Sequence, residues 1–200
     1  MNVKSIHKVI GIVLAIPLVA WSLTGIVFLV KPGYDGAYES LSVKTYPLEQ
    51  AFNIGSNDDW HEARLLRTAL GYHLLANDKG HSIHLDPVRM QLREVPSAAD
   101  IKRLVEDAIA GNRERYGKLI HVSGNKVKTS TGVEITLDWH NLSLAQSGRD
   151  TMLIDNLYKV HYLQWLGRPV PDTIFGVLGI ILLLSLTAFG LVGFVESKRK

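Results

Sequence analysis

Two of the eight histidines stand where an imidazole could bind a metal or a cofactor. His7 lies just before an apolar run, and His161 lies in an aromatic stretch that precedes a second apolar run. Neutral imidazole is the commonest protein ligand for metals and an axial ligand for haem iron. The chain has no cysteine, which excludes disulfides, thiolate metal sites and cysteine nucleophiles. His7 is the sharper candidate of the two.

His7 stands at the head of a stripe of small residues on a predicted helix. The positions that share its face within about 80° on a helical wheel are Gly11, Ala15, Leu18, Ser22 and Gly25. Such a stripe lets a second helix, or a flat macrocycle, approach closely. Gly11 would leave room for a porphyrin edge and joins His7 as a candidate cofactor-binding residue. The alternative is an interfacial histidine beside a stripe that serves plain helix packing, which the residues alone favour.

His161 has the same two readings, as a ligand of haem iron or as a residue of an aromatic belt. The other six histidines lack ligand-like spacing, and we expect them at solvated surface positions. His81 and His84 lie three apart in a predicted strand, so they point to opposite faces and make a poor metal site. The remaining four are His61, His73, His121 and His140.

Two long runs without charge surround these candidates. Val9–Val30 and Thr173–Val195 are 22 and 23 residues long, and a bilayer core needs about 20. All 41 charged residues fall in the remaining 155, which is an ordinary soluble composition. The sequence therefore predicts a soluble domain between two membrane anchors, and it excludes a cytosolic enzyme and a disordered chain. The anchors would place His7 and His161 about 30 Å apart.

Basic flanks set the expected orientation of the anchors. Lys4 and Lys8 precede the first run, and Lys198–Lys200 follow the second. Positive flanks stay cytoplasmic. We therefore expect both termini on the cytoplasmic side of a bacterial inner membrane and residues 32–172 in the periplasm. That segment carries 16 basic and 18 acidic residues. With no basic stripe or motif, nucleic acid is not an expected partner, whereas membrane lipid is.

The fold class expected for the exported part is α+β. Turn signals predict a hairpin of Gly71–Ala76 with His81–Leu85, because Asn-Asp-Lys-Gly lies between them. Ser97 and Asp100 resemble a capping box that starts a helix ending at Gly111 or Asn112. The other expected strands lie near Leu41–Tyr46 and over Met90–Val95, Lys118–Val122, Lys126–Thr129 and Val133–Trp139.

An amphipathic segment precedes the second anchor. Asp155–Gly167 is aromatic and amphipathic, which is typical of a helix lying on the outer leaflet. Pro169 and Pro171 should end that helix, and Asp172 should N-cap the second span. The expected parts are the first anchor (1–31), an α+β domain (32–155), an interfacial segment (156–171), and the second anchor with its basic tail (172–200).

The two ends of the chain resemble one known family. Ile6-His7-Lys8-Val-Ile-Gly11, with Thr24-Gly25 at the far end of the first run, is similar to the opening of PepSY-associated transmembrane proteins. Leu157-Tyr-Lys-Val-His161 through Gly167 resembles the second marker of that family, and Ile83–Pro87 before a capped helix is similar to a PepSY module. The resemblance implies a periplasmic antiparallel sheet with a packed helix. Some larger relatives, with four or more spans, are haem proteins that reduce iron–siderophore complexes.

The expected function follows from the histidines and this resemblance together. We expect haem b held by His7 and His161, each pairing with its mate in a homodimer or with another subunit of a membrane complex. Such a protein would support transmembrane electron transfer or periplasmic reduction of iron or other siderophore-bound metal. The alternative is a non-enzymatic accessory or assembly protein whose periplasmic domain binds a protein partner.

Overall fold

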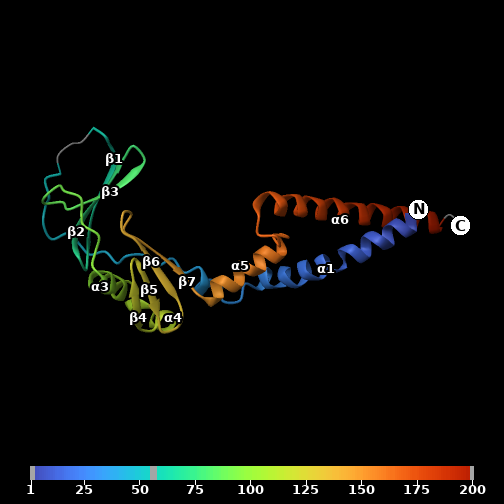
Figure 1. Ribbon diagram of the computed structural model, residues 1–200, viewed down its shortest axis with the longest axis horizontal. Helices are drawn as coiled ribbons and strands as arrows, with labels where there is room; N and C mark the ends of the chain where they lie inside the picture. Colours follow the sequence, from blue (N-terminus) through green and yellow to red (C-terminus); the bar gives the residue numbers. More distant parts are fainter. Residues whose placement is uncertain (1–2, 55–57, 199–200) are drawn as a thin grey trace. The chain divides into compact units, whose positions relative to one another are not determined.

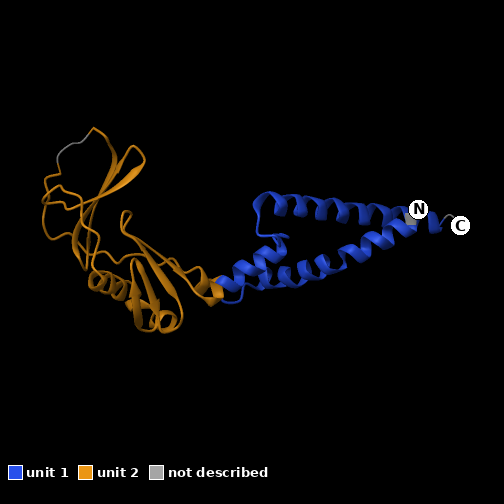
Figure 2. Cartoon of the chain, viewed as in Figure 1, with its two compact units in different colours: residues 1–33, 152–200 blue, residues 34–151 orange. Residues whose placement is uncertain are grey.

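The computed structural model describes residues 3–54 and 58–198. The chain is α+β and divides into two compact units (Figure 2). A helical unit comprises Met1–Gly33 and Met152–Lys200, and an α+β unit comprises Tyr34–Thr151. This boundary lies close to the expected limits of the α+β domain, residues 32 and 155.

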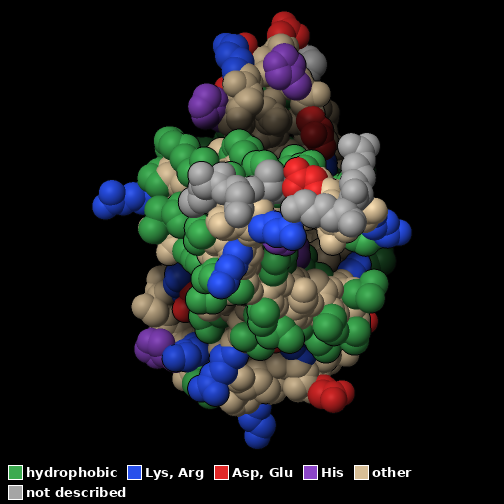
Figure 3. All heavy atoms as spheres, turned by 90° about the vertical axis from the view of Figure 1, so that its right-hand side faces the viewer, with side chains coloured by type: hydrophobic (Ala, Val, Ile, Leu, Met, Phe, Trp, Pro, Cys, Tyr) green, Lys and Arg blue, Asp and Glu red, His purple; other side chains and the backbone are tan. Residues whose placement is uncertain are grey.

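The helical unit is built on two long apolar helices, α1 (Val3–Val30) and α6 (Pro169–Lys198). Their 28 and 30 residues extend about 40 Å each at 1.5 Å per residue, which exceeds the thickness of a bilayer core. Their apolar side chains are largely exposed, and Figure 3 shows such side chains around the helix ends together with Lys and Arg. Both helices therefore have the length and composition of membrane spans.

α1 and α6 lie antiparallel, so that the start of α1 is beside the end of α6 (Figure 1). At the other end of α1, Phe28 stacks on Tyr158 of α5 (Arg149–His161) with ring centroids 4.4 Å apart. The chain then reverses through Tyr162–Arg168 and enters α6. The helical unit is thus closed by direct helix contact at one end, while α5 and the reversal lie between the helices at the other.

The start of α6 corrects the expected cap. The helix begins at Pro169, three residues before Asp172, because a proline lacks the N–H that the first helical position leaves unpaired. Asp172 lies inside the first turn and is buried. Its carboxylate accepts hydrogen bonds from the backbone N–H groups of Leu166 and Arg168, both 2.9 Å long. Asp172 therefore fixes the chain reversal rather than N-capping the span. α5 correspondingly ends at His161, so the expected helix does not continue to Gly167.

The α+β unit contains two antiparallel sheets. The first has the order β1-β2-β3, with β1 (Trp60–Thr68), β2 (Gly71–Asp78) and β3 (His81–Leu85). The second has the order β4-β5-β6-β7, with the strands β4 (Leu119–Ser123), β5 (Lys126–Thr129), β6 (Glu134–Asp138) and β7 (Ser143–Ser147). Short helical segments complete the unit: α2 (Tyr34–Ala37), η1 (Ile109–Gly111) and α4 (Arg113–Tyr116).

Local sequence signals explain the first hairpin. β2 and β3 are joined by a two-residue turn, Lys79-Gly80, with φ of 49° and 88°. Positive φ at both positions is the type I′ turn, whose twist matches that of paired strands. Asn77 accepts a hydrogen bond from the Gly80 N–H through its side-chain oxygen at 3.0 Å. The predicted hairpin is confirmed.

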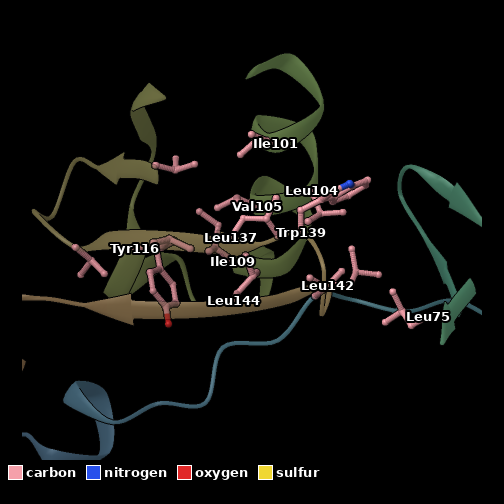
Figure 4. Packing of buried hydrophobic residues seen from close by; sticks show 14 residues of the cluster. Leu75, Ile101, Leu104, Val105, Ile109, Tyr116, Leu137, Trp139, Leu142 and Leu144 are labelled. Carbon is pink, nitrogen blue, oxygen red and sulfur yellow. The ribbon is translucent and has the colours of Figure 1, made fainter. Parts of the chain in front are cut away.

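The helix α3 (Ala98–Ala108) covers the four-stranded sheet. Its capping box is confirmed, since Ser97 accepts from the Asp100 N–H and Asp100 accepts from the Ser97 N–H. The hydrophobic core lies between this helix and the sheet (Figure 4), where Leu104, Val105, Ile109, Val127 and Ile135 are almost completely buried. Leu75 is the residue of β1–β3 that belongs to this cluster, and Leu66 of β1 packs against it.

Two predicted strands are wrong, and two strands, β1 and β7, were not predicted. The segment near Leu41–Tyr46 is not in a strand, and Tyr46 donates one backbone bond to the Arg67 carbonyl. Met90–Val95 holds only an isolated bridge, Leu85 with Leu92, because Met90 adopts a positive φ of 55° that interrupts an extended ladder. β7 has one buried apolar residue, Leu144, so its sequence lacks the buried–exposed alternation that marks β5.

Candidate functional site

His7 is held by the partner helix within the helical unit. Its Nδ1 lies 3.0 Å from the backbone carbonyl oxygen of Leu186 in α6. A carbonyl can only accept, so His7 must carry a proton on Nδ1, and the neutral ring has its lone pair on Nε2. A Cβ at Gly190 would lie 3.1 Å from His7 Cε1, so the glycine makes room for the ring.

Gly11 faces the same helix. A Cβ placed on Gly11 would lie 3.6 Å from Leu186 Cδ1, which is ordinary van der Waals contact. The small side of α1 thus packs on α6 at this position, as the packing interpretation of the stripe expects. The space beside Gly11 that a porphyrin edge would use holds the Leu186 side chain.

His161 is oriented by a hydroxyl from the other helix. Thr24 in α1 is 4% exposed, and its Oγ1 lies 2.8 Å from His161 Nδ1. The same hydroxyl donates to the Ala20 carbonyl at 2.7 Å, as a helical threonine commonly does. Because a hydroxyl has a single proton, it must accept from His161. His161 therefore also carries its proton on Nδ1 and a lone pair on Nε2.

The His161 ring is packed among aromatic side chains. Phe28 and Tyr162 contact it edge-on, with centroids 5.0 and 5.4 Å away. Tyr158 in turn stacks on Phe28. Edge-to-face packing of this kind is favourable for aromatic rings. The imidazole is thus held by one hydrogen bond and two ring contacts, and its Nε2 has no hydrogen-bond partner within residues 3–54 and 58–198.

A cavity of about 690 Å³ opens beside His161 in the helical unit. This volume is in the range that holds a drug-sized or cofactor-sized ligand. Its wall combines a cation, Lys159, with apolar side chains such as Val177 and Ile180. Trp21 also lines it, and the buried indole N–H of Trp21 lacks a hydrogen-bond partner within the described ranges.

The reversal between α5 and α6 forms part of the cavity wall. Leu163 and Gly167 have positive φ values of 55° and 66°, and the Asp172 carboxylate fixes the turn between them. On α6, a Cβ at Gly179 would lie only 2.8 Å from Leu163 Cδ1. The glycine therefore allows the reversal to lie directly on α6.

The two candidate histidines lie at different ends of the helical unit. His161 contacts α1 at Thr24, which is 17 residues beyond His7, or about 25 Å of helix. One copy of the chain does not bring the two imidazoles together. Within the described ranges, no group of three or more His, Asp or Glu side chains has a metal-binding arrangement.

Two further histidines, His73 and His84, form a cluster that the sequence did not reveal. His73 is 0% and His84 is 2% exposed, so the expectation of solvated positions is wrong for both. His81 is exposed, as expected for the opposite face of β3. The signal for His73 was its place inside the apolar run of β2, since a strand buried on both faces reads as nearly continuous apolar sequence.

Hydrogen bonds connect this cluster in one direction. The Trp139 carbonyl lies 2.7 Å from His84 Nδ1, so His84 donates to it. His84 Nε2 must then accept from His73 Nδ1, 2.9 Å away. His73 Nε2 in turn accepts from the Thr68 hydroxyl at 2.7 Å. Thr68 finally accepts from the Leu70 N–H at 3.0 Å, so the ring nitrogens of both histidines and the Thr68 hydroxyl are all paired.

The environment of both rings opposes a positive charge. Burial lowers the pKa of His73 to about 3, with the Arg93 cation and His84 acting in the same direction. Burial likewise lowers the pKa of His84 to about 4, although the hydrogen bond to the Trp139 carbonyl opposes this shift. Both imidazoles are therefore neutral at pH 7.

Asp138 and His140, which flank Trp139, do not form an acid–base pair. Asp138 accepts from the backbone N–H groups of His140 and Asn141 and from the Asn141 side chain. The Asn141 side-chain bond is the largest of the effects that lower the pKa of Asp138. Asp138 is thus an ionised turn cap between β6 and β7.

Comparison of the chain with models of known families, with curated proteins and with solved structures gave no match.

Proposed function

We propose that this protein is a PepSY-type haem protein of the bacterial inner membrane. It would support transmembrane electron transfer or periplasmic reduction of iron or siderophore-bound metal, as a homodimer or a subunit. The observation that carries the proposal is the shared tautomer of His7 and His161. Each ring donates its Nδ1 proton to a fixed oxygen and keeps a lone pair on Nε2. Oriented Nδ1–H groups are the usual second-shell arrangement of metal-binding histidines.

The surroundings of His161 fit a haem group better than those of His7. The cavity beside His161 has a suitable volume, apolar walls and a lysine that could meet a propionate. The tautomer of His7 is the same, but less space is left around its ring. Gly190 lies against the ring, and the Leu186 side chain occupies the space beside Gly11. A bound haem would supply a reversible one-electron change at iron. The residues of this chain would hold it, orient its ligand and exclude water.

Ligation by two imidazoles would require a second chain. Since His7 and His161 are far apart in one copy, each would pair with its symmetry mate across a two-fold axis. The exposed apolar surfaces of α1 and α6 are available for lipid and for such a partner. The proposed topology places both termini in the cytoplasm, following Lys4, Lys8 and Lys198. Protease added to spheroplasts should then cut the α+β unit and leave the termini intact, and the reverse pattern would contradict the orientation.

The alternative function, an accessory protein, is favoured by one exposed surface. Val88, Leu92 and Val95 are 73%, 74% and 79% exposed on the connection between β3 and α3. The first part of that connection is ordered by Asp86, whose carboxylate accepts from the Val88 and Arg89 N–H groups. Exposed apolar patches mark protein-binding surfaces, and these three side chains are the candidate patch of the α+β unit.

A visible absorption spectrum of the purified full-length protein tests the proposal. A Soret band that shifts on reduction supports it, and a protein without any Soret band after expression with ample haem rules it out. A colourless protein that co-purifies stoichiometrically with a partner supports the accessory function instead. Replacing Val88 and Leu92 by serine should then abolish that co-purification while leaving the fold intact.

A further inference from the structure

We propose that His73 and His84 form an acid-sensitive latch that holds the three-stranded sheet against the β6–β7 turn. Only a few polar contacts join these two parts of the α+β unit. His84 donates to the Trp139 carbonyl and lies against the Trp139 ring, with centroids 4.3 Å apart. Ser82 donates to the Asn141 side chain. The latch is therefore a large share of the polar connection between the sheets.

The hydrogen-bond chain can absorb one proton only at a cost. A proton on His84 Nε2 would require His73 to reverse its tautomer and donate to Thr68. Thr68 already accepts from the Leu70 N–H, so its own hydroxyl proton would lose its acceptor. The charge would also lie in a buried position, which is unfavourable without a paired anion.

A second proton disrupts the hydrogen bond between His73 and His84. With both rings charged, an N–H on His73 would face an N–H on His84 across 2.9 Å. Two donors at that distance repel each other, and neither has an acceptor. The rings must then separate, and since His84 is also bonded to Trp139, separation moves β3 relative to the β6–β7 turn. Opening is thus coupled to the uptake of up to two protons.

The charged groups around the latch reinforce this behaviour. The Arg93 guanidinium lies 5.9 Å from the Trp139 ring centroid and donates to the carbonyls of Leu70 and Tyr72. His140, on the β6–β7 turn, adds a second cation when it is protonated. Asp86 is the opposing anion, and its carboxylate is already engaged by backbone N–H groups. Near the two rings, cations therefore outnumber free anionic partners in acid.

Opening would leave the rest of the α+β unit folded. The cluster of buried hydrophobic residues lies mostly between α3 and the four-stranded sheet. Of the first sheet, Leu75 belongs to the cluster and Leu66 packs against it. Removing the first sheet from its neighbour therefore uncovers little of this core. The acid form should have a protected four-stranded sheet and a loosened three-stranded sheet.

Hydrogen exchange of the full-length protein in detergent micelles tests the latch. After correction for intrinsic rates, amides in β2 and β3 should exchange at least about tenfold faster at pH 4 than at pH 7, because a tenfold change corresponds to 1.4 kcal/mol. Amides in β5 and β6 should stay protected. Equal protection of β2 and β3 at both pH values would overturn the proposal.

A double variant, His73→Asn and His84→Asn, isolates the latch from other acid effects. It should lose the pH dependence of β2 and β3 exchange, whereas His121→Asn, at an exposed position of β4, should keep it. Retained acid sensitivity in the double variant would overturn the proposal. If the double variant does not fold, proton titration of the wild-type rings decides. His73 and His84 must stay neutral at pH 5.5. Titration of both rings near pH 6.5 would refute the latch.

Discussion

The histidines of the two units share a tautomer and differ in what faces their second nitrogen. His7, His161 and His84 each donate an Nδ1 proton to a fixed oxygen. In the α+β unit the remaining lone pair of His84 is taken by His73, whose own lone pair is taken by Thr68. In the helical unit the Nε2 atoms of His7 and His161 have no hydrogen-bond partner among the described residues. An imidazole whose two nitrogens are both hydrogen-bonded, such as His73 or His84, resists protons and ligands. An imidazole whose Nε2 is unpaired within the described ranges, such as His7 or His161, presents a lone pair to either.

Removing an imidazole whose Nε2 is unpaired among the described residues, that of His7 or His161, should have the largest effect, which is on haem binding. We expect His161→Ala to abolish haem binding at its site, because an axial ligand has no substitute there, and His7→Ala to act separately on a second haem. Haem per protein chain, measured from the Soret band, checks this. His61→Ala, which removes an exposed histidine of the α+β unit, is the control. Unchanged haem content and midpoint potentials in either ligand variant would return that histidine to a packing role.

Acid should lower the free energy of unfolding of the α+β unit by several kcal/mol, because His73 and His84 are held neutral in the folded state. The folded-state pKa values of His73 and His84, about 3 and about 4, lie below the unfolded value of 6.5. The unfolded state therefore binds more protons, so their contribution is fully present above pH 6.5 and is lost as the pH falls. The loss at pH 4 is about 3 kcal/mol for each ring, at 1.36 kcal/mol per pKa unit. Denaturant unfolding of the α+β unit, followed by tryptophan fluorescence from pH 7 to 4, measures it, and a flat profile would contradict the neutral state of both rings.

Replacing one of the two hydrogen-bonded histidines, His73 or His84, by alanine should lower the free energy of unfolding by somewhat less. His84→Ala leaves the Trp139 carbonyl and His73 N–H unpaired and opens a cavity, for a combined loss of about 3 kcal/mol. His81→Ala on the same strand removes an exposed ring and should change stability by less than about 0.5 kcal/mol. Denaturant midpoints at pH 7 compare the two variants. Equal midpoints would show that the buried chain stabilises nothing.

The smallest effect on haem binding should come from the Thr24 hydroxyl, which orients the His161 ring. Thr24→Val keeps the shape of the side chain but removes the acceptor of the His161 Nδ1 proton. Loss of such a second-shell partner lowers metal affinity about 10- to 100-fold. Ser22→Ala removes a comparable hydroxyl that bonds only to the Leu18 carbonyl, and it should leave haem affinity unchanged. Haem titration of both apoproteins makes the comparison, and equal affinities would assign Thr24 to helix packing.

Local signals were sufficient for the elements that local contacts build. The Lys79-Gly80 turn and the Ser97–Asp100 capping box are each decided within four residues, and both were predicted. Charge-free length identified α1 and α6 for the same reason. The predicted strand near Leu41–Tyr46 failed because a strand needs a paired neighbour, which no local pattern reports.

The histidine environments depend on residues far apart in the sequence. His84 bonds to a carbonyl 55 residues away, and His161 to a hydroxyl 137 residues away. The sequence indicated which histidines precede the apolar runs, but not which oxygen would fix each tautomer. It assigned His73 and His84 to solvent, because the burial of a histidine is decided by the partners that satisfy it.

The contact between His7 and the Leu186 carbonyl joins positions 179 residues apart, and this separation sets the order of assembly during synthesis. At about 5 to 20 residues per second, α1 leaves the ribosome roughly 10 to 40 s before its partner helix. The strands between them pair with close sequence neighbours, and such small domains fold within seconds. The α+β unit can therefore be complete before the hairpin of helices closes. Ribosome-bound chains that stop before α6 should already carry a protease-resistant middle segment on an unpaired first helix.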